Sequence, residues 1–367
     1  ADLRRCRIFA RFDAKNDDQG FALDDWPQGL ASQVSRARTR APGPSQKPLD
    51  KRFPKNWKIM NWKTLNWKIT AIAAVLNLLF AGALAASEAP ASAPDAAYQK
   101  DYEAWKAELA GDLKQNWLPL AGLFWLKQGE NSFGTGAGNA LVFPKGPARA
   151  GVFELQGKDV TLKLAPEARA TVAGKALMTM KLVPDTAENT TLVEMGSLRF
   201  HLIVRGERFG IRVKDVASEA VGKFRGLAFY PPDLNYRVTA RWEPSDGKRT
   251  VDVPNVLGDV SPTPVSGTAV FRIHGQEVRL TDLGEDPAKG LFFVFNDATS
   301  KTDTYPGGRF LYTDPVVNGT VVLDFNRAHN PPCAVTAYAT CPLAPHENRL
   351  PVAIPVGEKY DRGHARH

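Results

Sequence analysis

The sequence predicts a mainly β protein with antiparallel sheets in a sandwich or barrel-like arrangement, one N-terminal α-helix and a long proline-rich C-terminal loop. Three observations support this class. From about Leu141, apolar and polar residues alternate with the period of two that half-buried strands have. Helical spacing of apolar residues occurs near Tyr98 and is not evident later. Prolines cluster between Asn330 and Pro351, where they remove the backbone donors that a strand needs.

The predicted helix begins near Tyr98. Tyr98, Tyr102, Trp105 and Leu109 fall at i, i+4, i+7 and i+11, so their side chains share one face, with charged residues elsewhere. Gly111 is predicted to end the helix, because glycine is a poor helix former.

The predicted strands are separated by turn residues. The segment "LVEMGSLRFHLIVRGERFGIRVKD" is expected to form three of them, and "TVVLDFN" forms a strand near the C-terminus. Asn318-Gly319 is the pair best suited to a type I′ turn, because both residues tolerate positive φ angles. The turns are predicted at Gln156-Gly157, Met195-Gly196, Arg205-Gly206, His274-Gly275 and Asn318-Gly319.

Basic side chains alternate along two of the strands, residues 208–214 and 237–241. If these strands are neighbours, their guanidinium groups line one sheet face and can hold an anion through bidentate hydrogen bonds. The alternative is a face of ion pairs with Glu194, Glu243 or Asp215.

The N-terminal part resembles an export signal that lies behind an over-extended start. Residues 1–59 are rich in arginine and have no apolar periodicity, whereas Met60 is followed by a basic segment and an apolar stretch, residues 69–84. This stretch is shorter than the roughly 20 residues that cross a bilayer, and Ala83-Leu84-Ala85 is typical of a cleavage site. Residues 60–85 are therefore predicted to be a signal peptide, removed after Ala85. The alternative is a genuine disordered basic leader, residues 1–59, followed by a transmembrane anchor.

The charge distribution agrees with this division. Residues 1–85 hold 15 Lys+Arg against 7 Asp+Glu, which accounts for the whole net charge of +8. The remaining residues hold 32 of each sign, so no basic surface indicates nucleic-acid binding. We expect a linker at 86–96, a β-rich domain at 97–360 and a tail at 361–367. A division of the domain into subdomains at about 97–250 and 251–360 stays open.

A candidate polar cluster lies around the predicted strand that ends near Asp324. Asp324 and Asn326 share a strand face, and the chain leaves the sheet at Pro331-Pro332. The Asp324 carboxylate is therefore expected to bond groups in the loop 330–349. The predicted cluster consists of Arg309, Asp324, Asn326, Arg327, Asn330, Glu347, Asn348 and Arg349.

Several segments resemble a bacterial family that is defined only as a domain of unknown function, number 1684. They include "WLPLAGLFWLKQGENSFG", "FYPPDLNYRVTARWEP" and "VVLDFNRAHNPPCAVTAYATCPLAPHENRLPV", and the resemblance extends over nearly all of residues 98–357. It implies no established activity, cofactor or catalytic residue. It does imply that the Asp-Phe-Asn-Arg, Asn-Pro-Pro-Cys and Glu-Asn-Arg-Leu elements form one unit.

Three interpretations of the C-terminal loop compete. In an exported chain, the two cysteines that remain after cleavage, Cys333 and Cys341, favour a disulfide that closes a short loop, with Val335 and Tyr338 packed onto the sheet. A zinc site would use His329, Cys333, Cys341 and His346, although the family more usually has an aromatic residue and a proline at the histidine positions. A reactive cysteine near His329 is the third interpretation.

Together these observations predict an exported protein, periplasmic or secreted, that acts as a binding or envelope-associated module. The alternative is a hydrolase-type enzyme with an acid or base at Asp324, His329 or Glu347. We expect no cofactor, no nucleic-acid partner and no permanent membrane span in the mature chain. The sequence does not identify a partner, and a small ligand and an envelope component are both open. Ionisable groups that converge beside a deep pocket would favour the enzyme, and a fully paired cluster would favour the module.

Overall fold

The computed structural model describes residues 94–361 of the chain. The predicted start region 1–59, the signal peptide 60–85, most of the linker 86–96 and the tail beyond Asp361 lie outside the described residues, so these assignments stay predictions. Within the described part, no helix combines the length and the apolar character that a membrane crossing requires. All of this part belongs to one compact unit.

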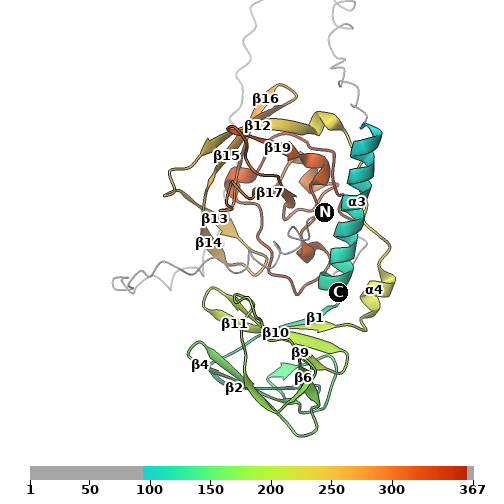
Figure 1. The fold of residues 1–367 in the computed structure, drawn as a ribbon, viewed down its shortest axis with the longest axis vertical. Helices are drawn as coiled ribbons and strands as arrows, with labels where there is room; N and C mark the ends of the chain where they lie inside the picture. The colour runs from blue at the N-terminus through green and yellow to red at the C-terminus, as the bar shows by residue number, and fades with distance from the viewer. Residues whose placement is uncertain (1–93, 362–367) are drawn as a thin grey trace, which may run out of the picture. The chain divides into compact units, whose positions relative to one another are not determined.

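Helix α3 (Ala96–Asp112) confirms the predicted helix (Figure 1). The Asp95 side chain accepts the backbone N–H of Tyr98 at 2.7 Å and so caps the first turn. The predicted end at Gly111 is wrong, because the chain continues through a π-helical turn, Leu113–Trp117. Burial of Leu109 and Leu113 on both sides of the glycine outweighs its cost of about 1 kcal/mol.

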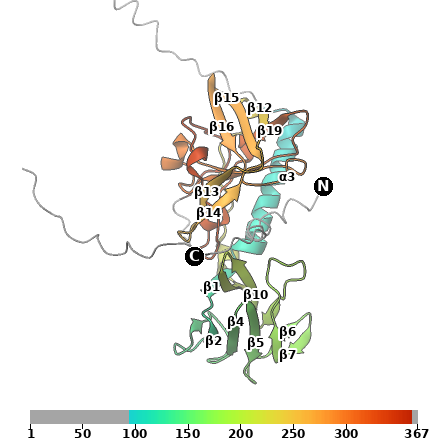
Figure 2. The same cartoon turned by 90° about the vertical axis from the view of Figure 1, so that its left-hand side faces the viewer.

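Two mostly antiparallel sheets form a sandwich in the first half of the described chain (Figure 2, green strands). The first has the order β1-β11-β10-β9-β6-β7. Its strands are β1 (Leu120–Trp125), β6 (Ala170–Val172), β7 (Lys175–Leu177), β9 (Val193–Met195), β10 (Leu198–Arg205) and β11 (Arg208–Asp215). The three strands predicted between residues 192 and 215 are therefore confirmed.

The second sheet of the sandwich has the order β3-β2-β4-β5-β8, with a parallel pair between β2 and β3. Phe133 and Phe153 on this sheet pack in one core with Phe200 and Ile211 on the first sheet, so the two sheets lie face to face. The strands are β2 (Gly129–Gly134), β3 (Leu141–Val142), β4 (Gly151–Gln156), β5 (Asp159–Leu164) and β8 (Thr179–Lys181). In the described residues no sheet closes into a barrel.

The second half is built around a four-stranded antiparallel sheet, β16-β15-β12-β19. Two strand pairs, β13-β14 and β17-β18, complete it. All four residues of β17 are buried, because one face packs on the four-stranded sheet and the other on β13 and the C-terminal loop. The strands are β12 (Arg237–Pro244), β13 (Thr250–Pro254), β14 (Val260–Pro264), β15 (Gly267–Ile273), β16 (Gln276–Thr281), β17 (Phe292–Phe295), β18 (Arg309–Tyr312) and β19 (Thr320–Asp324).

The predicted Asn318-Gly319 turn has the expected conformation, with φ angles of 50° and 72°. It leads from a single bridge at Val317 into β19, which pairs along its whole length with β12. The arginine-bearing strands β11 and β12 lie in different sheets, so the anion-holding sheet face that their pairing would create is not formed. Instead, Arg241 pairs with Glu243 at 2.6 Å.

The remaining elements are short helices that join the strands. Helix α4 (Glu219–Lys223) connects the sandwich to the second half. The C-terminal loop 330–349 is irregular, as predicted, apart from two single 3-10 turns. The 3-10 helices are Leu234–Tyr236, Ala298–Lys301, Phe325–Arg327, Pro332–Ala334 and His346–Asn348.

Candidate functional site

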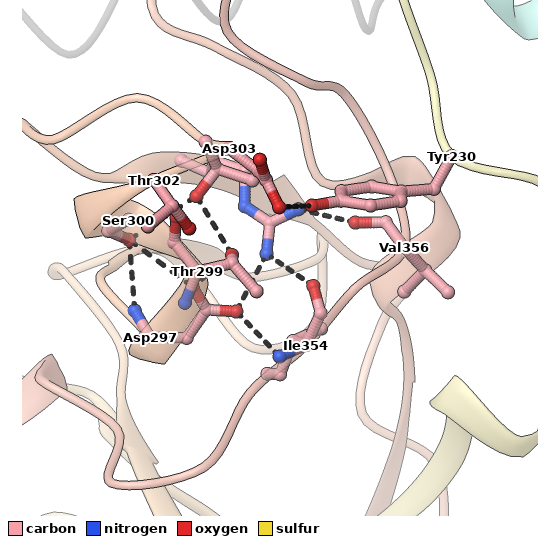
Figure 3. Close-up of polar contacts among 10 residues, drawn as sticks. Tyr230, Asp297, Thr299, Ser300, Thr302, Asp303, Ile354 and Val356 are labelled. Atoms are coloured by element: carbon pink, nitrogen blue, oxygen red, sulfur yellow. Dashed lines mark hydrogen bonds and ion pairs between the residues drawn. The ribbon is translucent and has the colours of Figure 1, made fainter.

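The most deeply buried charge of the predicted cluster is Arg309 on β18, which is 0% exposed. Its Nη2 donates to Asp297 Oδ2 at 3.0 Å and to the carbonyl of Ile354 at 2.9 Å, and its Nη1 donates to the carbonyl of Val356 (Figure 3). Asp297 also accepts the backbone N–H of Ile354 at 2.8 Å. Arg309 therefore anchors residues 352–361, which we call the terminal strap.

A second set of contacts, around Tyr230 and Asp303, holds the strap farther along; Figure 3 shows these two side chains facing each other. The Tyr230 hydroxyl donates to Asp303 Oδ2 at 3.0 Å, and the backbone N–H of Tyr360 donates to the Asp303 carbonyl at 2.8 Å. The Lys359 ammonium lies 4.3 Å from the centre of the Tyr230 ring. Burial, with the adjacent Asp303 carboxylate, raises the pKa of Tyr230 to about 12, so this hydroxyl keeps its proton and stays a donor at neutral pH.

The Asp324 carboxylate faces helix α3. It accepts the Tyr98 hydroxyl at 2.9 and 3.1 Å, and the Nε atoms of Arg237 and Arg327 lie 3.7 and 3.6 Å from Oδ2. Arg327 also pairs with Asp101 of the helix. These contacts fix helix α3 against the end of β19.

The expected bond between Asp324 and the loop 330–349 is therefore wrong. The physical reason is local: Asp324 caps the 3-10 turn Phe325–Arg327 that follows β19, accepting the backbone N–H of Asn326 at 3.2 Å. This conformation turns the carboxylate toward helix α3 and away from the residues that come later in the chain.

Asn326 and Asn348 are buried carboxamides that join backbone segments. Asn326 exchanges two hydrogen bonds with the backbone of Asp233, at 2.8 and 3.0 Å. Asn348 exchanges two with the backbone of Thr281, both at 2.8 Å, and donates a third to Val294. The neighbouring Glu347 and Arg349 are exposed. The predicted cluster therefore separates into several structural contacts and does not form one site.

The proposed zinc ligands do not gather. His329 is enclosed by the rings of Tyr312, Trp105 and Phe310, with centroid distances of 5.8 to 6.2 Å, and His346 is exposed. Burial lowers the pKa of His329 to about 4, so its ring is neutral. Within residues 94–361, no three His, Cys, Asp or Glu side chains are arranged to hold a metal ion. The three residues of the hydrolase alternative do not come together either. Asp324 faces helix α3, His329 is enclosed by aromatic rings, and Glu347 is exposed.

Cys333 and Cys341 are close to each other and both buried. The backbone N–H of Cys333 points at Sγ of Cys341 over 3.3 Å. Val335 and Tyr338, which are predicted to pack onto the sheet, are both half-buried. The loop packs through the cysteines and alanines, whose small side chains allow a close approach to β17 and β18. The disulfide itself stays a prediction.

A pocket of about 260 Å³ lies beside the terminal strap. Its walls come from three segments: residues 224–228, the C-terminal loop at Asn330, Ala334 and Val335, and residues 358–361. The strap is held to the first wall by hydrogen bonds between Lys359 N–H and the Ala228 carbonyl at 2.8 Å and between Tyr230 N–H and the Gly357 carbonyl at 2.9 Å. The pocket is therefore formed by backbone pairing of segments far apart in sequence.

Glu358 and Asn330 are the buried polar groups of this pocket, 4% and 8% exposed. Glu358 Oε2 accepts the backbone N–H of Asn330 at 2.8 Å. Burial raises the pKa of Glu358 to about 8. Hydrogen bonds from Asn330 and the charge of Arg309 act in the opposite direction, because they favour the ionised form. Glu358 is thus a neutral carboxylic acid at pH 7, able both to donate and to accept.

Asn330 belongs to the predicted polar cluster, but Glu358 does not. A signal was present: Ile354, Val356 and Glu358 alternate along the chain, and all three are buried. A period of two places an acid on the same face as two core residues, which marks it as a buried group. Of the predicted cluster, only Asn330 lines the pocket.

Comparisons with known proteins give a family without a described activity. The family model described as "Protein of unknown function (DUF1684)" matches residues 222–359. The solution NMR structure of an uncharacterised protein from Haloarcula marismortui is 31% identical, over 40% of this chain and 82% of that one, with a TM-score of 0.34. A chain from a crystal structure of the FhaA FHA domain complexed with the intracellular domain of Rv3910 is 15% identical, over 25% and 97%, with a TM-score of 0.18. No curated protein matches the chain.

Proposed function

The chain belongs to the DUF1684 family of proteins of unknown function, whose matched residues 222–359 include most of the pocket lining, and we propose that this region binds a small ligand in that pocket. The observation that carries the proposal is a pocket of about 260 Å³ that combines apolar side chains with a buried acid. Phe224, Leu227 and Val335 supply the apolar lining, and Glu358 is the buried acid. Pockets that are mostly apolar with a few polar groups are the usual binding places of small ligands.

The state of the remaining polar residues supports binding over catalysis. Arg309, Asp324, Asn326 and Asn348 each use their polar atoms to hold backbone or helix segments together. Such groups are not available to polarise a substrate or to move a proton. The pocket adds one titratable acid that is buried, Glu358, without a nucleophile at its side among the residues that line it.

We further propose that the protein works outside the cytoplasm, in the periplasm or after secretion. The support comes from residues 60–85, with their basic start, apolar stretch and Ala-Leu-Ala cleavage site. N-terminal sequencing of protein from the native host should give a start at or near Ala86. Peptides from the region 11–40 in that material would contradict the proposal.

A thermal-shift screen of the purified protein tests the binding function. We expect at least one class among amines, sugars, nucleotides, acyl compounds and metal ions to raise the melting temperature, since a ligand at 100 times its Kd adds about 2.7 kcal/mol. Ala228→Trp places an indole in the pocket from an exposed position and should abolish the shift. Val260→Trp, also at an exposed position but on β14, is the matched control. A screen without any shift, or a shift that Ala228→Trp leaves intact, would refute the proposed pocket.

A further inference from the structure

One wall of the pocket is the segment 331–336, which we call the wall turn, and its residues Ala334 and Val335 line the pocket. Two of its six residues are prolines, which have no N–H to donate. Three of the other four backbone N–H groups donate to carbonyls inside the turn, at 2.9 to 3.1 Å. The fourth, on Cys333, points at Sγ of Cys341 over 3.3 Å. The backbone donors of the wall turn therefore reach outside it at one atom, the sulfur of Cys341.

Cys341, in contrast, is held by elements that do not line the pocket. Its carbonyl accepts the N–H of Val256 at 3.1 Å, just beyond the end of β13. The hydroxyl of the preceding residue, Thr340, accepts hydrogen bonds from Arg205 Nε and Arg212 Nη2 of the sandwich, at 3.3 and 3.2 Å. The sulfur that the wall turn contacts therefore belongs to a fixed part of the fold.

A ring contact connects the same cysteine pair with a second wall of the pocket. The Tyr305 hydroxyl lies 3.5 Å from Sγ of Cys333, and the Tyr305 ring meets the ring of Tyr360 edge-on at a centroid distance of 5.0 Å. Tyr360 belongs to the terminal strap and lines the pocket. A change at the sulfur of Cys333 can therefore reach two pocket walls, along the chain to Val335 and through Tyr305 to Tyr360.

We propose that the oxidation state of Cys333 and Cys341 controls ligand binding in the pocket. This inference rests on the proposed binding function. Sγ of Cys341 lies within about 5 Å of Cα of Cys333, because it is 3.3 Å from the nitrogen and the N–Cα bond adds about 1.5 Å. A disulfide needs Cα atoms about 4.4 to 6.8 Å apart, which this position of the sulfur allows. In the disulfide form the wall turn is tied covalently to the fixed Cys341, whereas in the dithiol form the N–H contact and packing hold it.

The oxidant for this pair is a low-molecular-weight disulfide, such as oxidised glutathione. One protein thiolate attacks the small disulfide, the S–S bond of that molecule breaks, and one small thiol leaves. The second protein thiolate displaces the other half, so that the bond between Cys333 and Cys341 forms and a second small thiol leaves. The cysteine pair loses two electrons, and its two protons end on the released thiols. Because the cytosol keeps thiols reduced and exported proteins meet oxidising surroundings, the pocket reaches its full affinity after export.

The effect on affinity follows from the mobility of the wall turn. The dithiol form should bind about tenfold more weakly, because a ligand must then also order the wall turn, and ordering the backbone of a single residue costs a free energy of that size. By linkage, a bound ligand raises the equilibrium constant for disulfide formation by the same factor.

Two forms of the unmodified protein test this inference, one refolded with oxidised glutathione and the other with dithiothreitol. Both cysteines are buried, so thiol exchange in the folded protein is slow and each form persists during a measurement. Benzyl alcohol, and each compound that the thermal-shift screen finds, is titrated into both forms by calorimetry. Hydrogen–deuterium exchange on the same samples follows the wall turn. We expect tighter binding and slower exchange in the disulfide form, with equal exchange in the Asn318-Gly319 hairpin as the internal control.

A variant separates the bridge from other effects of the two solutions. Cys341→Ser cannot form the disulfide and should bind as the dithiol form does under both conditions. In dithiothreitol, this variant and the unmodified protein should have the same affinity, which makes that condition the matched control.

The outcomes separate the inference from the proposed function. If both forms bind a compound equally well and Ala228→Trp abolishes that binding, the redox control is wrong and the binding pocket stands. Equal exchange of the wall turn in the two forms also overturns the redox control. Since both comparisons use the unmodified protein, the test holds even if Cys341→Ser does not fold. Absence of binding by benzyl alcohol and by every class in the thermal-shift screen, in both forms, overturns the proposed function and the inference with it.

Discussion

Replacement of Arg309 by methionine should remove much of the stability of the fold. The guanidinium and its partner carboxylate on Asp297 are both 0% exposed in their side chains, and the ion pair spans 3.0 Å. In the variant, the Asp297 charge stays buried without its counter-ion, and the carbonyls of Ile354 and Val356 lose their donors. Removal of one partner from a buried pair costs about 3 to 5 kcal/mol. At roughly 2 to 4 °C per kcal/mol for a domain of this size, the melting temperature should fall by roughly 6 to 20 °C.

Urea denaturation followed by tryptophan fluorescence measures this loss. Arg279→Met is the matched control, because Arg279 is half-exposed and its pair with Glu243 lies at the surface, where ion pairs contribute about 0 to 1 kcal/mol. The double variant Arg309→Met with Asp297→Asn should lose less stability than Arg309→Met alone, because it no longer buries an unpaired carboxylate. Equal losses in Arg309→Met and Arg279→Met would refute the anchoring role of Arg309.

Three other predictions concern titration and oxidation. The folded-state pKa of Glu358, about 8, lies above its ordinary value. The stability that this carboxyl contributes is therefore fully present below pH 4.5 and is lost as pH rises to 8. In Glu358→Gln the urea midpoint should change less with pH across that range. The folded-state pKa of His329 is depressed to about 4, so its contribution is present above pH 6.5 and is lost as pH falls toward 4; His329→Phe should remove this acid-side decline. In exported protein, alkylation under denaturing conditions should find Cys333 and Cys341 joined by a disulfide worth about 2.5 kcal/mol, and two alkylated thiols would contradict it.

Periodicity predicted most of the fold because it is a local property of the chain. Helix α3, the three strands between residues 193 and 215 and the positive φ angles at Asn318 and Gly319 all follow from near neighbours in sequence. The pairing of β19 with β12 does not, because these strands are separated by most of the second half of the chain. Nor could the sequence decide whether the basic strands β11 and β12 are neighbours, because strands that follow each other in the chain can belong to different sheets, as these two do.

The candidate site was harder to predict because polar residues in an irregular loop have two different uses. The predicted cluster was selected for polarity near Pro331-Pro332, and irregular backbone needs polar side chains for its own hydrogen bonds. Asn326 and Asn348 serve that need. Asn330 does so only in part, since its Oδ1 is left over, and this difference depends on atomic contacts that sequence alone does not contain.

Arg309 holds the strap close to the position of the buried acid Glu358. Arg309 binds the carbonyls of Ile354 and Val356, and Glu358 follows two residues after the second of these. One residue, Gly357, separates Val356 from Glu358, so the Arg309 bond to the Val356 carbonyl restricts where the Glu358 side chain can lie. A slip of the strap by one residue would bring Gly357 or Lys359 to the position of the acid. An Arg309 variant that still folds should therefore bind a pocket ligand more weakly, although Arg309 does not line the pocket.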